Sequence, residues 1–304
     1  MKVQKQASGI ETRRKKQKKI KFFLVSILVL AAIVTLMLSP VFNITGVAAT
    51  GSRHYTQEQL VGVTGLSAGL NGFKTLAVNV GSVGNVDRLF SLRFATAEES
   101  ILNSFPYVKE AVVRYKPVGT VRIDIIERQP IALVPYMGTN LLVDDEGYVL
   151  DTVQQPEDKV LSNQKGPLPS DEESPGPSGY VPLPYIKGLM FESYKMGQAL
   201  ICENQDSFMN VKLILESIRD SDESNNTKIM ELVNYLDVST EKSVCLSVDS
   251  RIVVNLGDVK SMGYDTLLYR INFFRQIFMK NLKKEDRGLL DFTIGDNPKF
   301  IPEK

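Results

Sequence analysis

The fold of the first half of the chain is decided by residues 108–127, which read VKEAVVRYKPVGTVRIDIIE. The Lys-Pro-Val-Gly run at 116–119 is a turn signal, and the residues on both sides of it are rich in β-branched side chains. After the turn, apolar residues alternate with polar ones, as in a strand with one buried face: Val121, Ile123 and Ile125. The stretch therefore predicts a β-hairpin with strands at 108–115 and 120–127.

Elements that precede the hairpin extend it to a small domain. A capping box at 56–59 (Thr-Gln-Glu-Gln) predicts a short helix to about Val63, and a second one at 96–99 (Thr-Ala-Glu-Glu) predicts a helix to about Ser104. Residues 42–47 are typical of a short strand. The order strand, helix, helix, strand, strand indicates a small sheet covered by two helices over residues 42–127. Residues 65–95, rich in Gly and Asn, make this block longer than the arrangement needs.

The second block, residues 128–304, predicts a larger mixed sheet domain, so that the whole chain is of the α+β class. Helical spacing is present at 208–219 and 263–282. Strand-like runs are more numerous, beginning with a hairpin around Asp145-Glu146-Gly147 and continuing at 228–237, 243–249, 251–256 and 287–294. Residues 154–179 hold five of the chain's 14 prolines, which predicts a flexible loop or linker.

The N-terminal region predicts a membrane anchor. Residues 1–21 hold nine basic groups and one acid, and the 17 residues from Phe22 to Leu38 carry no charge, with Ser26 and Thr35 as their only polar side chains. At a rise of about 1.5 Å per residue this run covers roughly 25 Å, the lower limit for a spanning helix. We therefore predict a basic cytoplasmic tail at 1–21 and a transmembrane helix at 22–40, with everything after it outside the cytoplasm.

Two other interpretations of this N-terminus compete with an anchor. A cleaved signal peptide has an apolar run of about 7–15 residues and a small-residue cleavage site. This run is longer, and the nearest small-residue cluster, Val47-Ala48-Ala49, lies well past Pro40. Nucleic-acid binding by the basic tail is the other alternative, but positive charge on the cytoplasmic side of a span explains the tail sufficiently. Without the tail, the chain's 36 basic and 35 acidic groups fall to 27 and 34, a net charge of −7.

The composition disfavours catalysis. One histidine and two cysteines cannot assemble a Cys/His zinc cluster, and any Ser-His-Asp arrangement would depend on His54. Phosphate-loop, dinucleotide and zinc-protease motifs are absent. We expect no enzyme, no cofactor, no metal and no catalytic residue, although a carboxylate-based peptidoglycan hydrolase stays open because acids are plentiful. Cys202 and Cys245 are interpreted as buried small hydrophobes, with a bridge between them left open.

Four short motifs, in this order behind a single span, resemble the bacterial cell-division family FtsQ/DivIB. The first, Phe-Pro-Tyr-Val at 105–108, enters the hairpin, and the second is Glu-Arg-Gln-Pro-Ile-Ala at 127–132. The third is the Asp-Asp-Glu-Gly turn at 144–147, and the fourth is Leu-Pro-Tyr-Ile-Lys-Gly at 183–188. Simpler explanations exist for single residues: Pro106 and Pro130 can merely end elements, and Arg128 of the junction motif Glu127, Arg128 and Pro130 can merely pair with an acid.

The resemblance implies a domain organisation and a function. It predicts a POTRA domain at 42–127 and an FtsQ/DivIB-type β domain at 128–304. The protein would be a single-pass scaffold of the divisome, located at the septum, that binds FtsB/DivIC-like and FtsL-like proteins and helps control septal peptidoglycan synthesis. Nucleic acids and small-molecule substrates are not expected as partners. The alternative is a POTRA-bearing envelope module that chaperones secreted chains and has no division role.

The resemblance also places the FtsB/DivIC contact on the last strands of the second domain. The run at 287–294 alternates, and the sequence ends ten residues later, with Pro298 and Pro302 expected to prevent regular pairing. We therefore expect this run to be a sheet edge to which a partner segment adds, with specificity from the side chains that face away from the core: Leu289, Asp291 and Thr293. The alternative is that the strand lies within the sheet and completes the core.

Overall fold

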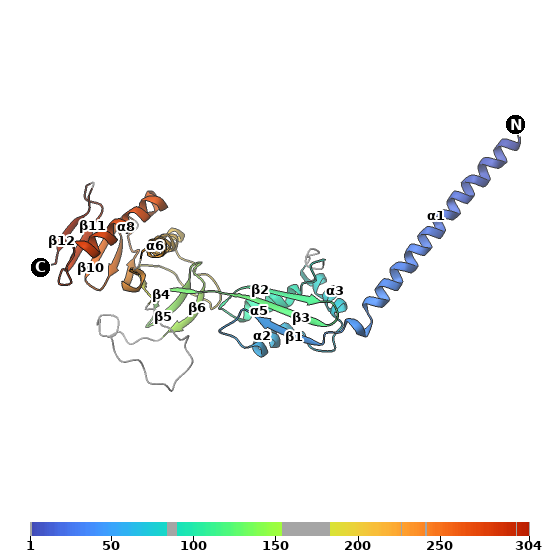
Figure 1. Ribbon diagram of the computed structural model, residues 1–304, viewed down its shortest axis with the longest axis horizontal. Helices are drawn as coiled ribbons and strands as arrows, with labels where there is room; N and C mark the ends of the chain where they lie inside the picture. The colour runs from blue at the N-terminus through green and yellow to red at the C-terminus, as the bar shows by residue number, and fades with distance from the viewer. Residues whose placement is uncertain are drawn as a thin grey trace. The chain divides into compact units, whose positions relative to one another are not determined.

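The computed structural model describes residues 2–83, 90–153, 183–225, 227–240, 242–295 and 297–303. The chain divides into two compact units. Unit 1 comprises Met1–Ser104 and Val108–Glu127, and unit 2 comprises Phe105–Tyr107 and Arg128–Lys304 (Figure 1). The expected loop at 154–179 lies outside the described residues.

The chain begins with one long helix, α1 (Lys2–Met37). Its segment Lys19–Met37 has a mean hydropathy of 2.6, none of it is buried, and it is long and apolar enough to cross a membrane. The large apolar side chains from Phe22 to Leu36 are 45–76% exposed. The helix ends at Met37, three residues before Pro40, which opens a short 3-10 turn, η1 (Pro40–Phe42).

Unit 1 is built on a three-stranded sheet with the order β1-β3-β2. The predicted hairpin is confirmed as β2 (Val108–Lys116) and β3 (Thr120–Glu127), and β1 (Gly46–Thr50) runs parallel to β3. Among the residues that the structure describes, the helices that accompany the sheet are α2 (Gln57–Thr64), α3 (Gly72–Val83) and α5 (Ala95–Ser104). The predicted inner face of β3 is confirmed, since Val121, Ile123 and Ile125 are all buried.

Two local predictions in unit 1 need correction. The first strand begins at Gly46 and not at Phe42, because the backbone of Ile44 pairs with the loop at 69–70 instead of with the sheet. The capping box at Thr56 is confirmed, but the one at Thr96 is wrong: α5 begins at Ala95, so Thr96 is already inside the helix. The segment 65–95, which is longer than a sheet with two helices needs and whose role the sequence leaves open, contains α3.

Helix α3 escaped prediction because its glycines hide an amphipathic pattern. Asn71 caps it, its side-chain oxygen accepting the N–H of Lys74 at 3.0 Å. Phe73 and Leu76 follow at helical spacing, and Leu76 is fully buried. The cap residue and the i, i+3 pair were the available signals.

Unit 2 contains, among its described residues, a nine-stranded sheet with the order β12-β11-β10-β9-β8-β7-β4-β5-β6. The strands are β4 (Pro130–Tyr136), β5 (Thr139–Asp144), β6 (Val149–Val153), β7 (Tyr185–Lys187), β8 (Val233–Asp237), β9 (Val244–Val248), β10 (Ile252–Gly257), β11 (Gly288–Asp291) and β12 (Lys299–Pro302). The predicted helices are confirmed as α6 (Gln205–Glu223) and α8 (Tyr264–Lys280), and a short helix α7 (Val259–Met262) precedes α8. One-turn η3 (Met230–Leu232) leads into β8.

The core of unit 2 lies between one face of the sheet and the helices α6 and α8, which lie side by side in Figure 1. Helix α8 contributes Leu267, Ile271, Phe274 and Phe278, and every second residue of β9 and β10 points to the same layer. The other sheet face carries half-buried side chains such as Tyr235 and Val253. The α+β class is thus confirmed, and the described part of each unit contains one sheet.

Strand β12 overturns the predicted position of the sheet edge. The run at 287–294 forms β11 only as far as Asp291, and the chain then bends and returns as β12, antiparallel to β11. Strand β11 therefore lies between β10 and β12. Strand β4 was also missed, because two of its seven residues, Pro130 and Pro135, are prolines.

Candidate partner-binding surface

Strand β12 is one of the two edge strands of the unit 2 sheet, the other being β6, and its pairing shows which backbone groups it leaves for a partner. Gly288 donates to Arg251 and Phe292 donates to Asn255, so even-numbered residues of β11 bond β10. The backbone N–H and C=O groups of the odd-numbered residues of β11 then face β12, where Leu289 is opposite Ile301 and Asp291 is opposite Lys299. In an antiparallel ladder, pairs of opposite residues that are hydrogen-bonded to each other alternate with pairs that are not. The N–H and C=O of Phe300 must therefore point away from the sheet.

Prolines flank this outward-facing position. Pro302, two residues after Phe300, points its ring nitrogen outward, where no ladder bond is lost, and Pro298 stands just before the strand. The expectation that these prolines prevent pairing is wrong for that reason: they restrict only the outer side. Across this strand the edge offers a single N–H, that of Phe300, together with carbonyl oxygens.

A hollow of about 520 Å³ lies on the open face of the sheet beside β12. Its floor includes Tyr235, Ser247 and Val253, and Ile301 and Pro302 form the side nearest the edge. Leu289 lines it as well, which keeps this predicted residue within the candidate surface. A hollow of this size holds one or two side chains of a bound segment.

Charged groups surround this hollow. The Nζ of Lys187 lies 3.6 Å above the centre of the Tyr235 ring, and the Lys187 side chain is exposed. Arg251 is bound within the unit, donating to Asp249 at 2.7 Å and to the carbonyl of Lys283 at 2.8 Å. Glu303 is the acid that lines the hollow. Lys187 is thus the cation placed to meet an acidic partner.

The two other predicted specificity residues have different surroundings from Leu289. Asp291 is only 7% exposed, and its carboxylate accepts hydrogen bonds from the N–H and the hydroxyl of Thr293. Thr293 lies past the end of β11. The pair therefore fixes the turn that follows β11. The structure instead places Phe300, Ile301, Lys187 and Tyr235 at the candidate surface; the alternating Pro-x-Phe-x-Pro run at 298–302 was the signal for the first two.

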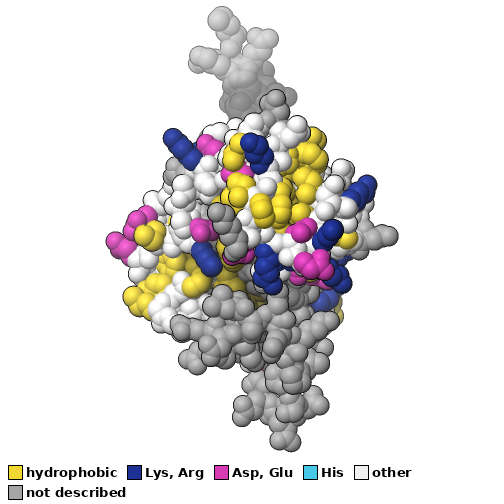
Figure 2. Space-filling view, turned by 90° about the vertical axis from the view of Figure 1, so that its left-hand side faces the viewer, with side chains coloured by type: hydrophobic (Ala, Val, Ile, Leu, Met, Phe, Trp, Pro, Cys, Tyr) yellow, Lys and Arg dark blue, Asp and Glu magenta, His cyan; other side chains and the backbone are white. Residues whose placement is uncertain are grey.

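Apolar side chains also gather on the helix side of this edge. Figure 2 shows the side of unit 2 where β12 lies, with hydrophobic side chains interspersed with both kinds of charge. Tyr269, 66% exposed, contacts Phe273, which in turn makes an edge-to-face contact with Phe292 at 6.3 Å. Ile294, past the end of β11, is 41% exposed, and on the open face Ile301 is 45% exposed. Both faces next to the β12 edge can thus receive apolar groups.

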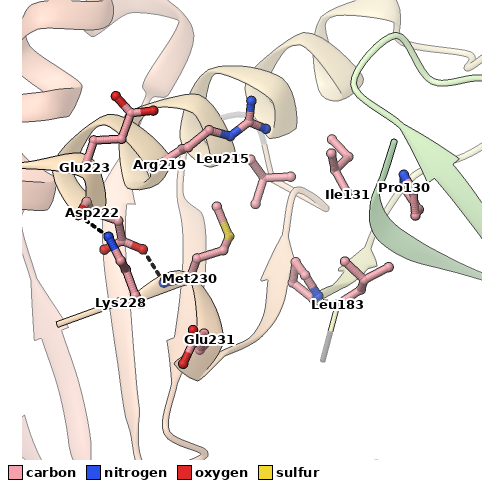
Figure 3. A pocket seen from close by; sticks show the side chains of 11 residues that line it. Pro130, Ile131, Leu183, Leu215, Arg219, Asp222, Glu223, Lys228, Met230 and Glu231 are labelled. Atoms are coloured by element: carbon pink, nitrogen blue, oxygen red, sulfur yellow. Dashed lines mark hydrogen bonds between the residues drawn. The ribbon is translucent and has the colours of Figure 1, made fainter. Parts of the chain in front are cut away.

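A second hollow, of about 400 Å³, lies where the end of α6 meets η3 and the start of β4 (Figure 3). Ile131, Leu215 and Met230 give it an apolar lining. Its one buried acid is Asp222, whose oxygens accept the N–H groups of Ile229 at 2.8 Å and Met230 at 2.9 Å and also bind Arg275. This carboxylate is committed to holding the loop after α6, which argues against a role in acid-base chemistry.

The predicted junction motif is divided between the units at Glu127 and Arg128. In unit 1, burial opposes ionisation of Glu127, but hydrogen bonds from the His54 N–H, the Ser52 hydroxyl, the His54 ring and the Arg53 N–H outweigh it and hold its pKa below the usual value. His54 is therefore occupied in closing the 52–54 turn.

In unit 2, Arg128 is nearly buried and pairs with acids, as the simpler explanation of the motif held. Its Nη1 donates to Asp144 at 2.6 Å and to Glu146 at 2.8 Å, and its guanidinium lies 3.5 Å from the centre of the Tyr148 ring. Burial alone would lower its pKa, but these acids raise it. Pro130 is the first residue of β4, where its missing N–H costs little. In unit 2, Arg128 and Pro130 thus hold the beginning of strand β4.

The two cysteines are unbridged. Cys202 is buried and Cys245 is partly buried, and both are free thiols. Burial raises the pKa of each thiol, which keeps both protonated and unreactive near neutral pH.

No protein-family model matches the chain, and no curated protein matches it either. Among solved structures, the chain is similar to the major extracytoplasmic domain of the trans isomer of the bacterial cell division protein DivIB from Geobacillus stearothermophilus. The identity is 11%, the TM-score is 0.27, and the likeness covers 52% of this chain and 98% of that chain.

Proposed function

We propose that this chain is a single-pass membrane scaffold of bacterial cell division. Its N-terminus would lie in the cytoplasm, and its two units would lie outside and bind FtsB/DivIC-like and FtsL-like proteins at the septum, thereby helping to control septal peptidoglycan synthesis. The order of the four sequence motifs behind one apolar helix supports this proposal. No catalytic role is proposed, because His54 and Asp222 are both held in structural hydrogen bonds.

The observation that carries the binding proposal is the outer side of β12. No strand pairs with it among the described residues, and it lies next to the hollow lined by Leu289 and Ile301. An extended partner segment can add to such an edge by backbone hydrogen bonds. Because the edge offers only the Phe300 N–H, side chains of the partner must supply much of the affinity, and both neighbouring faces are apolar enough to receive them.

The edge is tested by Phe300→Pro, with Phe300→Ala as its matched control. Both variants lose the same aromatic ring, but only the proline removes the outward N–H. Since that N–H makes no bond within the sheet, the proline should not disturb the ladder. Binding of a purified DivIC-like ectodomain to the full-length chain should be about tenfold weaker for the proline variant than for the alanine variant, the effect of one lost hydrogen bond with an unsatisfied partner carbonyl.

Equal affinities in two variants with the same melting temperature would overturn addition at β12. The division role is tested separately by co-purification from cross-linked cells of the source bacterium. Recovery of a DivIC-like protein supports the scaffold, whereas recovery of secreted chains without division proteins supports the chaperone alternative.

The proposed topology is tested by alkaline-phosphatase fusions. A fusion after Gly51 should be active and a fusion after Lys19 inactive, because nine basic groups precede the uncharged run. The reverse pattern would contradict the cytoplasmic N-terminus. An active first fusion together with a shortened mature chain would favour the signal peptide.

A further inference from the structure

Within unit 1, the end of α1 is held against the rest of the unit by direct hydrogen bonds. The side-chain nitrogen of Asn71 donates to the carbonyl of Met37 at 3.2 Å and to that of Ser39 at 3.1 Å. Carbonyls at the end of a helix have no partner within the helix, so an outside donor stabilises them. The loop that ends at Asn71 therefore lies directly against the last turn of α1.

Aromatic packing makes this junction rigid. Phe73 makes edge-to-face contacts with Phe42 at 5.1 Å and with Tyr115 at 5.5 Å between ring centres. The Tyr115 hydroxyl donates to the carbonyl of Phe42 at 2.8 Å. Gly72 packs so tightly that an added Cβ would lie 2.4 Å from the Tyr115 ring. The end of α1, the start of α3 and the hairpin strand β2 thus move as one body.

The tip of the β2–β3 hairpin belongs to the same end of unit 1. Residues 43–45 run between two other segments: Ile44 donates to the carbonyl of Leu70 at 2.7 Å on one side, and Thr45 donates to that of Gly119 at 2.5 Å on the other. Neighbouring segments joined by such bonds lie about 5 Å apart. The loop at 69–71, residues 40–45 and the hairpin tip are therefore adjacent, all next to the end of α1.

Three apolar side chains are exposed on these adjacent segments. Val41 is 65% exposed, Leu70 39% and Val118 72%. Val118 also has a φ of 79°, a conformation that is a genuine outlier for a β-branched residue. A polar residue or glycine would suit water better at each of these positions. Two exposed lysines lie next to these segments: Lys74 in the first turn of α3, after the loop, and Lys116 at the end of β2, before the hairpin tip.

We propose that Val41, Leu70 and Val118 form a lipid-contacting rim that rests on the outer surface of the bilayer, with Lys74 and Lys116 at the level of the lipid phosphates. This inference rests on the membrane-anchor part of the proposed function. The 19 residues Lys19–Met37 span about 28 Å at 1.5 Å each, close to the roughly 30 Å of a hydrocarbon core. Met37 then lies at the boundary of that core, and Asn71 binds its carbonyl, so Leu70 cannot be far from the lipid.

The chain contains no tryptophan, so single substitutions give clean fluorescent probes. The variants are Val41→Trp, Leu70→Trp and Val118→Trp, in the full-length chain reconstituted into phosphatidylglycerol–phosphatidylcholine vesicles with brominated acyl chains. The matched control is Ile126→Trp, which is 55% exposed in the wild type and lies eight residues along the hairpin from Val118, about 26 Å away at 3.3 Å per residue. Bromine should quench the three rim probes and blue-shift their emission, and should leave the control unchanged.

Flotation of the same vesicles after alkaline extraction distinguishes the two levels of the proposal. Variants that float, keep the wild-type melting temperature and show no more quenching at the rim positions than at Ile126 overturn the rim and leave the anchor standing. A chain that does not float overturns the anchor, and the rim with it. Quenching at only one of the three positions also contradicts a rim, because the three segments are fixed to each other.

Discussion

The edge strands β2 of unit 1 and β12 of unit 2 differ in whether other parts of the chain pair with them. In unit 1, β2 is covered by the chain itself: Phe94 donates to the carbonyl of Val113 at 2.8 Å, Tyr115 donates to that of Leu92 at 2.8 Å, and Glu98 accepts the N–H of Val113 at 2.9 Å. In unit 2, no described segment pairs with the outer side of β12, and two prolines leave it one donor.

This difference separates a structural edge from a candidate binding edge. An uncovered strand invites indiscriminate pairing, and proteins limit that risk by covering the edge or by shortening it with proline. Strand β2 of unit 1 is covered, whereas β12 of unit 2 is shortened by proline. Of these two strands, only β12 leaves room for a partner. That partner would be a short segment whose side chains, more than its backbone, determine the affinity.

The largest predicted effect tests whether the two sheets are independent. Ile123→Asp places an unpaired charge in the fully buried core of unit 1 and should destabilise that unit by about 4 kcal/mol or more. Hydrogen exchange should show β3 unprotected while β9 and β10 stay protected, and capture of a partner at β12 should persist. Ile126→Asp, on the exposed face of the same strand, is the control and should change little. Simultaneous loss of protection in both sheets would show one cooperative body.

A smaller effect is expected from uncovering the β2 edge. Glu98 is 2% exposed, binds the Arg93 side chain through both carboxylate oxygens and accepts the Val113 N–H. Glu98→Gln should cost about 2–3 kcal/mol of unit 1 stability, since an amide cannot serve two charged donors and a buried N–H equally. Thermal unfolding measures the loss, and sedimentation detects any new self-association. Glu99→Gln, exposed on the same helix, should leave both unchanged.

Much of the fold could be predicted from local patterns. The hairpin at 108–127 shows both a turn signal and a clean alternation, so its strands were placed within one residue. Helices α2, α6 and α8 carry caps or long apolar stripes. The elements that could not be predicted are those whose local sequence disfavours their structure: α3 with its glycines, β4 with its two prolines, and the short strand β12. Their packing partners lie far away in the sequence, so tertiary contacts override weak propensity.

The candidate surface was harder to predict than the fold. Which strand forms an edge depends on sheet order, and sheet order is a property of long-range pairing that alternation alone does not show. The prediction placed Leu289, Asp291 and Thr293 on an edge strand because nothing regular was expected after them. Because β12 pairs with β11, the edge lies at Phe300 instead. Asp291 and Thr293 bond each other in the turn after β11, and of the three residues Leu289 lines the hollow.

Acid should loosen unit 1 at the end where Glu127 closes the 52–54 turn. Its folded pKa is below the value of 4.5 for an unperturbed glutamate, so its contribution to stability is present above pH 4.5 and is lost as the pH falls through the folded value. Glu127→Gln should therefore lower the stability of unit 1 by about 1–2 kcal/mol at pH 7, and the difference from wild type should shrink in acid. Chemical denaturation at pH 7 and below pH 4 measures this. A pH-independent difference would show that the hydrogen bonds do not depend on the charge.

The smallest predicted effect concerns the hollow beside β12 in unit 2. Lys187 is exposed above Tyr235, where a cation on an aromatic ring contributes about 0.5–1 kcal/mol. If the hollow receives an acidic segment, Lys187→Gln should weaken capture by about threefold and reduce its dependence on salt, because one attraction that salt screens has been removed. Lys195→Gln removes an equally exposed charge of the same unit that does not line the hollow, and it should change neither quantity. Equal losses in the two variants would mean that net charge alone guides the partner. A loss confined to Lys187 would mean that the face beside β12, and not the bare edge, selects the segment that binds.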